Sequence, residues 1–175
     1  MKSIFLVGYM GCGKSTLGRK LARRLNIPFF DTDSLIEERE GASVNDIFHY
    51  EGEAYFRELE RETIVQILAE EQAHVVSTGG GLPVWQDNME LMNGVGRTIY
   101  LQRSVAQIIR RLSPYGRQKR PNLRGLSDEE LVEHMTRNLA EREPFYAKAQ
   151  TVVACEALSD DELITILLQE VTSEK

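Results

Sequence analysis

The stretch that decides the fold is GYMGCGKS at residues 8–15, a full match to the phosphate-binding pattern G-x-x-x-x-G-K-[ST]. It follows an apolar run at residues 4–7 and precedes Leu17, Leu21 and Leu25, which recur at the spacing of one helix face. Glycines at a strand-to-helix turn let backbone N–H groups surround phosphate oxygens, while Lys14 reaches the outer phosphates and the Ser15 hydroxyl binds Mg²⁺. The flanking strand and helix patterns disfavour the alternative, a glycine-rich turn without a ligand.

The rest of the chain alternates short runs rich in Val, Ile, Phe and Tyr with longer helical patterns. The predicted strands cover residues 3–7, 28–31, 74–77, 97–101 and 151–154. This alternation is typical of an α/β fold with a mainly parallel sheet. Ser127 and Ser159 precede acidic residues and should begin helices through capping boxes, and Pro83 suits a first helical turn. Because no repeat or linker interrupts the pattern, we expect the 175 residues to form a single domain, 1–175.

Composition excludes several classes of protein. With 42% hydrophobic and 27% charged residues the chain should build a core, and its net charge of −6 argues against general nucleic-acid binding. Cys12 and Cys155 are too few for a disulfide framework, and Cys12 is expected to be a small filler in the loop. No apolar run approaches the ~20 residues needed to cross a bilayer, and the N-terminal run is too short for a signal peptide. We therefore expect a cytoplasmic protein that binds neither membrane nor nucleic acid.

The positions of the acidic residues narrow the class of phosphate-loop protein. The N-K-x-D signature of guanine-reading switches is absent, and the run VVST at residues 75–78 ends in three glycines rather than in a Walker B acid. Asp31 and Asp33 instead follow Phe29 and Phe30, and on an extended strand their side chains would leave one face about 6.6 Å apart. One carboxylate could hold Mg²⁺ while the other orients or deprotonates an acceptor hydroxyl. The alternative is that either acid only caps a helix beginning near Ser34.

Three further features have both a functional and a plain interpretation. Gly79, Gly80 and Gly81 would allow a ligand to approach the backbone, but any glycine run also permits a turn. Glu60 lies three residues after Arg57 in a helical pattern and could hold the Arg57 guanidinium in place within a binding site. The alternative is an ion pair on the protein surface. Arg142 is expected to end a helix before Pro144, where it could simply complement the helix C-terminus.

Positive charge is concentrated in one region, since no acidic residue lies between Glu90 and Asp128. The eight cationic residues there are Arg97, Arg103, Arg110, Arg111, Arg117, Lys119, Arg120 and Arg124. Four of them fall in residues 113–125, a stretch that fits no regular element and is interpreted as a lid closing over ATP. The alternative is a solvated basic face. His49, His74 and His134 lack metal-ligand spacing and are interpreted as structural or surface residues.

Taken together, these motifs resemble the shikimate kinase family, P-loop kinases with the nucleoside monophosphate kinase fold. The matching segments occur in the family's order and spacing over nearly the whole chain: G-x-M-G-x-G-K-S-T at 8–16, D-T-D at 31–33, G-E-A-x-F-R-x-x-E at 52–60, G-G-G at 79–81, R-P at 120–121 and R-x-P-x-Y at 142–146. The resemblance implies a three-layer α/β/α fold of the P-loop NTPase type with a five-stranded parallel sheet in the order 2-3-1-4-5. It also implies a substrate-binding region at about 34–60 and a lid at about 113–125.

The family's activity is phosphorylation of the 3-hydroxyl of shikimate by ATP with Mg²⁺, a step toward chorismate and the aromatic amino acids. At matching positions the resemblance implies catalytic roles for Asp33, Lys14 and Arg120, with Mg²⁺ bound by Ser15 and, through water, by Asp31. The implied shikimate-binding residues are Asp33, Phe48, Phe56, Arg57, Gly79, Gly80, Gly81 and Arg142. The implied ATP-binding residues are Gly11, Cys12, Gly13, Lys14, Ser15, Thr16, Arg111 and Arg120.

The resemblance has one local departure: Arg120-Pro121 is followed by Asn122-Leu123 rather than by two leucines. Either Arg110 or Arg111 is expected to pack on adenine, and a monomer is expected for this size and family. Two alternatives remain: a related kinase that acts on gluconate or a nucleoside monophosphate, and a non-catalytic module that binds ATP to alter a partner surface.

Overall fold

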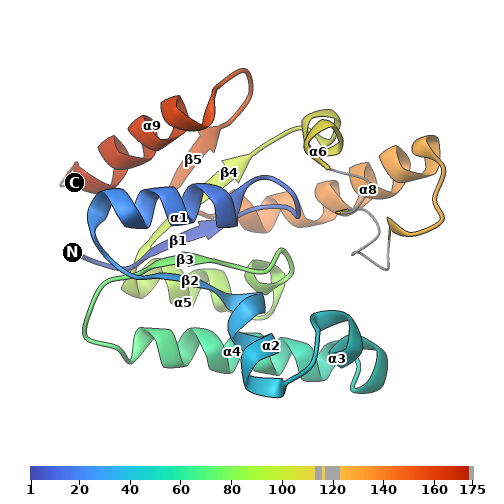
Figure 1. Cartoon of the computed structure of the whole chain (residues 1–175), viewed down its shortest axis with the longest axis horizontal. Helices are drawn as coiled ribbons and strands as arrows, with labels where there is room; N and C mark the ends of the chain where they lie inside the picture. Colours follow the sequence, from blue (N-terminus) through green and yellow to red (C-terminus); the bar gives the residue numbers. More distant parts are fainter. Residues whose placement is uncertain (113–115, 117–122, 174–175) are drawn as a thin grey trace.

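The computed structural model describes residues 1–112, 116 and 123–173 (Figure 1). The elements in chain order are β1 (Ile4–Val7), α1 (Lys14–Leu25), β2 (Phe29–Asp31), α2 (Thr32–Glu40), α3 (Val44–Tyr50), α4 (Glu53–Leu68), β3 (Val75–Ser77), the 3₁₀ turn η1 (Leu82–Val84), α5 (Asn88–Val95), β4 (Arg97–Gln102), α6 (Val105–Arg111), α8 (Asp128–Tyr146), β5 (Thr151–Ala154) and α9 (Asp160–Thr172). The five strands are parallel and lie in the order β2-β3-β1-β4-β5, which confirms the predicted sheet.

The sheet lies between two layers of helices because both faces of its strands are apolar (Figure 1). In β1, Ile4 and Leu6 face the layer formed by α1 and α9, where they pack in one cluster with residues such as Leu17 and Leu163. Phe5 and Val7 face the opposite layer, where α4, α5 and α8 contribute a second cluster. The alternation along one strand therefore fixes both layers of the fold.

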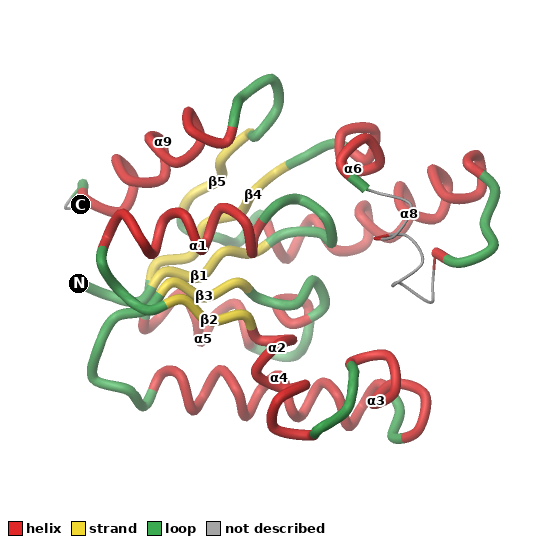
Figure 2. Tube along the Cα trace, viewed as in Figure 1, coloured by secondary structure: helices red, strands yellow, loops and turns green. Residues whose placement is uncertain are grey.

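A smaller helical unit extends the molecule beyond β2. Ile36, Ile47, Phe56 and Leu59 form a separate buried cluster that joins α2, α3 and the first turns of α4. Figure 2 shows α2, α3 and α6 at one end of the sheet, and the strand arrows in Figure 1 point toward that end, the carboxyl edge. Ligands of open α/β sheets bind at this edge, so the unit forms one wall of the expected site.

Several local predictions are confirmed. Ser127 and Ser159 each form a capping box with the glutamate three residues later, and Pro83 lies in the first turn of η1. No described helix is long and apolar enough to span a membrane. Most of the predicted lid, Arg120 included, lies outside the described residues.

The prediction that a helix ends at Arg142 is wrong, because α8 continues through Pro144 to Tyr146. A proline removes one backbone hydrogen bond from a helix interior. The side chain of Tyr146, fully buried in the core cluster, holds the last turn against the sheet layer. Arg142 is therefore part of a continuous helix and does not lie at its C-terminus.

Candidate active site

The phosphate-binding loop joins β1 to α1 in the predicted way. Gly8, Gly11 and Gly13 have φ values of 143°, 75° and 105°, a region that side chains other than glycine rarely adopt. Gly13 is the N-cap of α1, so the helix begins directly at the end of the loop. The buried Lys14 ammonium donates to the carbonyls of Gly8 (2.8 Å) and Tyr9 (2.9 Å), which holds it inside the curve of the loop.

This loop borders a cavity of about 370 Å³ at the carboxyl edge of the sheet. Its lining comes from the phosphate loop, the ends of β2 and β3, and α6: Met10, Gly11, Gly13, Lys14, Ser15, Thr16, Asp31, Asp33, Ser77, Thr78, Gly79, Gly80 and Arg111. Cys12, within the loop, is buried and does not line the cavity, as expected of a filler residue. The cavity combines a helix N-terminus, a lysine and hydroxyl groups, which suits a polyphosphate.

Three oxygen-bearing side chains meet beside Lys14. The Ser15 hydroxyl donates to Asp31 Oδ2 (2.6 Å) and lies 3.1 Å from the hydroxyl of Ser77. Asp31 Oδ1 also accepts the backbone N–H of Ser34 (3.4 Å) as the N-cap of α2. Asp31 is therefore the helix cap that the sequence suggested, and its other oxygen lies beside Ser15.

The expectation that Asp31 and Asp33 project from one strand face is wrong. The strand ends at Asp31, and α2 begins at Thr32, so Asp33 lies in the first helical turn. The change follows from the Asp31 cap, which begins the helix two residues earlier than the sequence suggested. Both carboxylates nevertheless line the 370 Å³ cavity.

A second cavity of about 680 Å³ adjoins the first. It lies between the helical unit, the three glycines and α8, and is lined by Met10, Asp33, Val44, Asn45, Asp46, Phe48, His49, Glu53, Phe56, Arg57, Glu60, Gly79, Gly80, Gly81, Arg124 and Arg142. The two cavities share Met10, Asp33, Gly79 and Gly80. Asp33 therefore lies where a group in one cavity would meet a group in the other.

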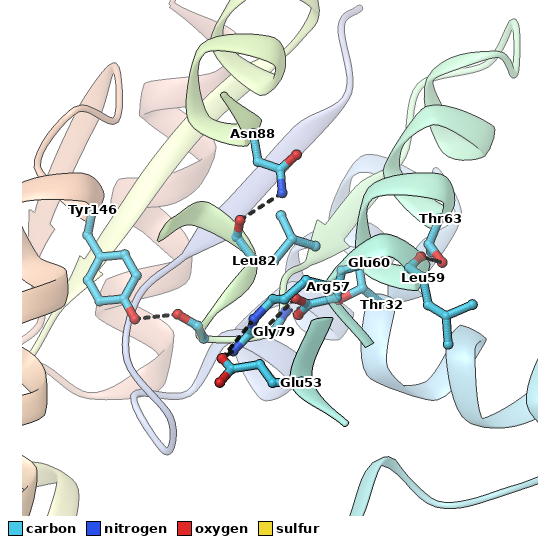
Figure 3. A network of polar contacts seen from close by, with 11 residues as sticks. Thr32, Glu53, Arg57, Leu59, Glu60, Thr63, Gly79, Leu82, Asn88 and Tyr146 are labelled. Atoms are coloured by element: carbon cyan, nitrogen blue, oxygen red, sulfur yellow. Dashed lines mark hydrogen bonds and ion pairs between the residues drawn. The ribbon is translucent and has the colours of Figure 1, made fainter. Parts of the chain in front are cut away.

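Arg57 is held rigidly in the second cavity (Figure 3). Its Nη1 donates to Glu60 Oε2 (2.6 Å), and its Nε and Nη2 donate to Glu53 Oε1 (3.3 and 2.9 Å). The guanidinium also lies 5.7 Å from the ring centroids of Phe48 and Phe56. Because Arg57 is buried, the surface ion-pair interpretation is wrong.

Two carboxylates in this region have unusual proton affinity. The pKa of Asp33 is raised to about 6, first by burial and then by repulsion from Asp31, against the attraction of Lys14. The pKa of Glu60 is raised to about 7 by burial, against the attraction and hydrogen bond of Arg57. Both acids flank Gly79: a Cβ there would lie 2.5 Å from Glu60 Oε1 and 2.7 Å from Asp33 Oδ1.

The three glycines form the floor between the cavities. A side chain at Gly81 would overlap the guanidinium of Arg57, whereas Gly80 has ordinary space beside Met10 and Arg142. The Tyr146 hydroxyl donates to the Gly80 carbonyl (2.5 Å), and Figure 3 shows it reaching the glycine segment from α8. The structure thus brings together the glycines, Arg57 and Arg142, which are distant in sequence.

Comparison with known proteins identifies the family. The sequence model of the family described as shikimate kinase matches residues 10–172. This chain belongs to the shikimate kinase family. A shikimate kinase of Bacteroides thetaiotaomicron is 46% identical over 160 residues, covering 91% of this chain and 90% of the relative.

Solved structures of family members share the whole fold. A crystal structure of a shikimate kinase from Bacteroides thetaiotaomicron has a TM-score of 0.87 and 43% identity, covering 97% of each chain. A shikimate kinase from Acinetobacter baumannii in complex with shikimate has a TM-score of 0.83 and 32% identity, covering 98% of this chain and 93% of that one. The predicted family and fold are therefore confirmed.

Within this member of the shikimate kinase family, the structure adds residues to the cavity lining that the sequence analysis did not assign to either binding site. Met10 borders both cavities, and Arg124 and His49 line the larger one. Of the two arginines considered for adenine, Arg111 lines the nucleotide-side cavity and contacts Asp160 at 3.8 Å. Such neighbours come from separate elements, so no local sequence pattern could reveal them.

Proposed function

We propose that this chain transfers the γ-phosphoryl group of ATP to the 3-hydroxyl of shikimate. The observation that carries the proposal is the position of Asp33, which lines both the phosphate-loop cavity and the adjoining cavity that contains Arg57 and Arg142. A phosphoryl donor in the first cavity and a hydroxyl acceptor in the second would meet beside one carboxylate. This is the arrangement that in-line phosphoryl transfer requires.

Asp33 is suited to accept or orient the proton of the acceptor hydroxyl. A general base works best when its pKa lies near the working pH, and the pKa of Asp33 is raised to about 6 by burial. Its Oδ1 is enclosed and accepts no hydrogen bond from the residues that the structure describes. In our proposal the acceptor hydroxyl donates to this oxygen while its own oxygen attacks the γ-phosphorus.

Lys14 and the helix N-terminus would bind the phosphate groups. The ammonium lies inside the loop, where it could exchange its bonds to the Gly8 and Tyr9 carbonyls for phosphate oxygens. Gly11, Gly13 and Thr16 supply the surrounding wall, and Arg111 extends it from α6, where we propose that it packs on adenine. Arg120, which lies outside the described residues, remains our proposed lid arginine.

The residues beside Lys14 fit a magnesium ion. The hydroxyl of Ser15 and the carboxylate of Asp31, 2.6 Å apart, are oxygen ligands of the kind that Mg²⁺ prefers, with further positions left for phosphate and water. We propose that Ser15 holds the ion directly and Asp31 holds it through a water molecule. When bound, Mg²⁺ neutralises charge on the phosphates.

The second cavity has the charges and shape for shikimate, a small hydroxylated carboxylate. Arg57 and Arg142 supply two guanidinium groups for the carboxylate, together with the backbone of the glycine floor. Phe48 and Phe56, whose ring centroids are 4.6 Å apart, wall the ring side. Asp33 then faces the hydroxyl groups at the junction.

The deciding experiment measures ADP release with Mg-ATP and shikimate, gluconate, AMP or buffer alone. Release with shikimate only is the expected result. Release with a different acceptor would overturn the assignment of the acceptor cavity. ATP binding without release in any mixture would favour a non-catalytic regulatory module.

We also propose that the enzyme is a single-domain monomer of the cytoplasm that binds neither nucleic acid nor membrane. The net charge of −6 supports the absence of nucleic-acid binding, and the buried free thiols of Cys12 and Cys155 suit a reducing compartment. Sedimentation equilibrium would test the oligomeric state: a mass near 19.9 kDa is expected.

A further inference from the structure

The backbone of the glycine floor is almost fully committed to hydrogen bonds. The Gly79 N–H donates to Thr32 Oγ1 (2.9 Å), and the carbonyls of Gly79 and Gly81 accept the N–H groups of Leu82 (3.2 Å) and Val84 (3.1 Å). The Gly80 carbonyl accepts the Tyr146 hydroxyl. Among the described residues, only the N–H groups of Gly80 and Gly81 in this segment have no acceptor. They are the donors left for a ligand in the larger cavity.

The hydrogen bond from Tyr146 fixes the direction of one of these donors. The Gly80 carbonyl and the Gly81 N–H belong to the same peptide unit, which is planar and trans, so they point in opposite directions. Holding the oxygen toward α8 therefore holds the Gly81 N–H away from α8. A peptide between two glycines rotates with little steric resistance, because neither residue has a Cβ. Without a partner on the oxygen, the donor would not keep one orientation.

Tyr146 is built into the core in a way that makes this bond rigid. Its side chain is fully buried, its ring centroid lies 5.3 Å from that of Tyr100, and it belongs to the last turn of α8. Arg142 lies one turn earlier on the same helix and approaches Gly80 from the same side, since its Nη1 would be 3.6 Å from a Cβ placed there. Helix α8 therefore positions both Arg142, which lines the larger cavity, and the hydroxyl that holds the glycine floor beside it.

We propose that Tyr146 is a positioning residue for the acceptor: its hydroxyl locks the Gly80–Gly81 peptide so that the Gly81 N–H is held toward the carboxylate of the bound acceptor. Tyr146 does not touch the acceptor and takes no part in the transfer. The inference rests on the proposed function, because it assumes that an anionic acceptor such as shikimate occupies the larger cavity. It predicts that removing one buried oxygen weakens acceptor binding and leaves the nucleotide side unchanged.

The test compares Tyr146→Phe with the wild type. Phenylalanine keeps the ring packing and removes only the hydroxyl, so the Gly80 carbonyl loses its partner and Arg142, on the same helix, loses its contact with the hydroxyl oxygen. We expect both the shikimate Kd, measured by calorimetry without ATP, and the shikimate KM to rise about tenfold. The KM for ATP and kcat should stay within about twofold of wild type, because the phosphate loop and Asp33 are untouched.

Tyr100→Phe is the matched control. It removes a buried tyrosine hydroxyl from the same ring pair, but that hydroxyl donates to Glu143 (3.2 Å) and not to the glycine floor. Its shikimate Kd should stay near the wild-type value. An unchanged Kd in Tyr146→Phe, equal losses for shikimate and ATP, or the same loss in Tyr100→Phe would each overturn the inference. A wild type that neither binds nor phosphorylates shikimate would instead overturn the proposed function itself, and with it this inference.

Discussion

Replacing Glu60 with glutamine should flatten the pH dependence of the free energy of unfolding. The Glu60 side chain is only 1% exposed, and burial raises its pKa to about 7 from an ordinary value of 4.5 even though Arg57 opposes the shift. Between these two pH values the folded protein keeps the proton and the unfolded chain has released it. Stability therefore falls as pH rises through this window, and this group adds no pH dependence below or above it.

The size of the effect follows from the width of that window. Each pH unit corresponds to about 1.4 kcal/mol, so the carboxylate of Glu60 should cost about 3 kcal/mol of stability at neutral pH relative to pH 4.5. Glutamine cannot ionise, yet its side-chain oxygen can still accept the 2.6 Å hydrogen bond from Arg57. The difference in unfolding free energy between variant and wild type should thus shift by about 3 kcal/mol in favour of the variant across the window.

Urea unfolding at several pH values, with chelator and without substrates, measures this difference directly. Glu53→Gln is the matched control, because it removes the 66% exposed carboxylate on the other side of the same guanidinium. Solvent screens that charge, so its curve should run parallel to the wild-type curve. If the Glu60→Gln curve also runs parallel from about pH 4.5 to pH 7.5, burial does not control the ionisation of Glu60 and the reasoning fails.

Three substitutions test the roles of individual side chains in the site. Asp33→Asn should retain ATP binding and lower kcat by about 10²- to 10⁴-fold, and near-normal turnover with shikimate would exclude Asp33 as base or orienting group. Arg57→Ala should raise the shikimate KM on the order of 10²-fold at constant ATP KM, since the buried carboxylate of bound shikimate loses its partner. An unchanged shikimate KM would remove Arg57 from the acceptor site. Gly81→Ala should displace the guanidinium of Arg57 and raise the shikimate KM by about tenfold. Its control is Gly94→Ala in α5, where an added Cβ would meet no atom within 4 Å. This variant should leave the kinetics unchanged and raise stability by about 0.5–1 kcal/mol in urea unfolding. Equal kinetic losses in both variants would contradict the steric argument.

The phosphate loop, the strands and the helix caps were predictable because their signals are local. A glycine with positive φ, a serine three residues before a glutamate and a run of β-branched residues each act within one or two turns of chain. The sheet order came from the family resemblance, since periodicity alone does not say which strands are neighbours.

The parts of the site that sequence reasoning missed depend on tertiary contacts. The bond from Tyr146 to Gly80 spans 66 residues, and nothing near either residue indicates it. The same packing explains why α8 continues through Pro144, where a local rule predicted its end. Asp31 shows the converse, because one carboxylate divides two interactions between its oxygens: Oδ1 accepts the N–H of Ser34 and caps α2, while Oδ2 accepts the Ser15 hydroxyl.

The three glycines illustrate how the structure decides between interpretations that the sequence left equal. None of Gly79, Gly80 and Gly81 has a φ in the left-handed region, so the backbone conformation does not itself require glycine. Space does: a Cβ at residue 79 would strike the carboxylates of Asp33 and Glu60, and one at residue 81 would strike Arg57. The side chains that leave no room for a Cβ at residues 79 and 81 thus also line the larger cavity, which we propose binds the acceptor. A glycine floor of this kind is needed because charged groups from three elements converge on it, and its shape is set by those groups rather than by the turn.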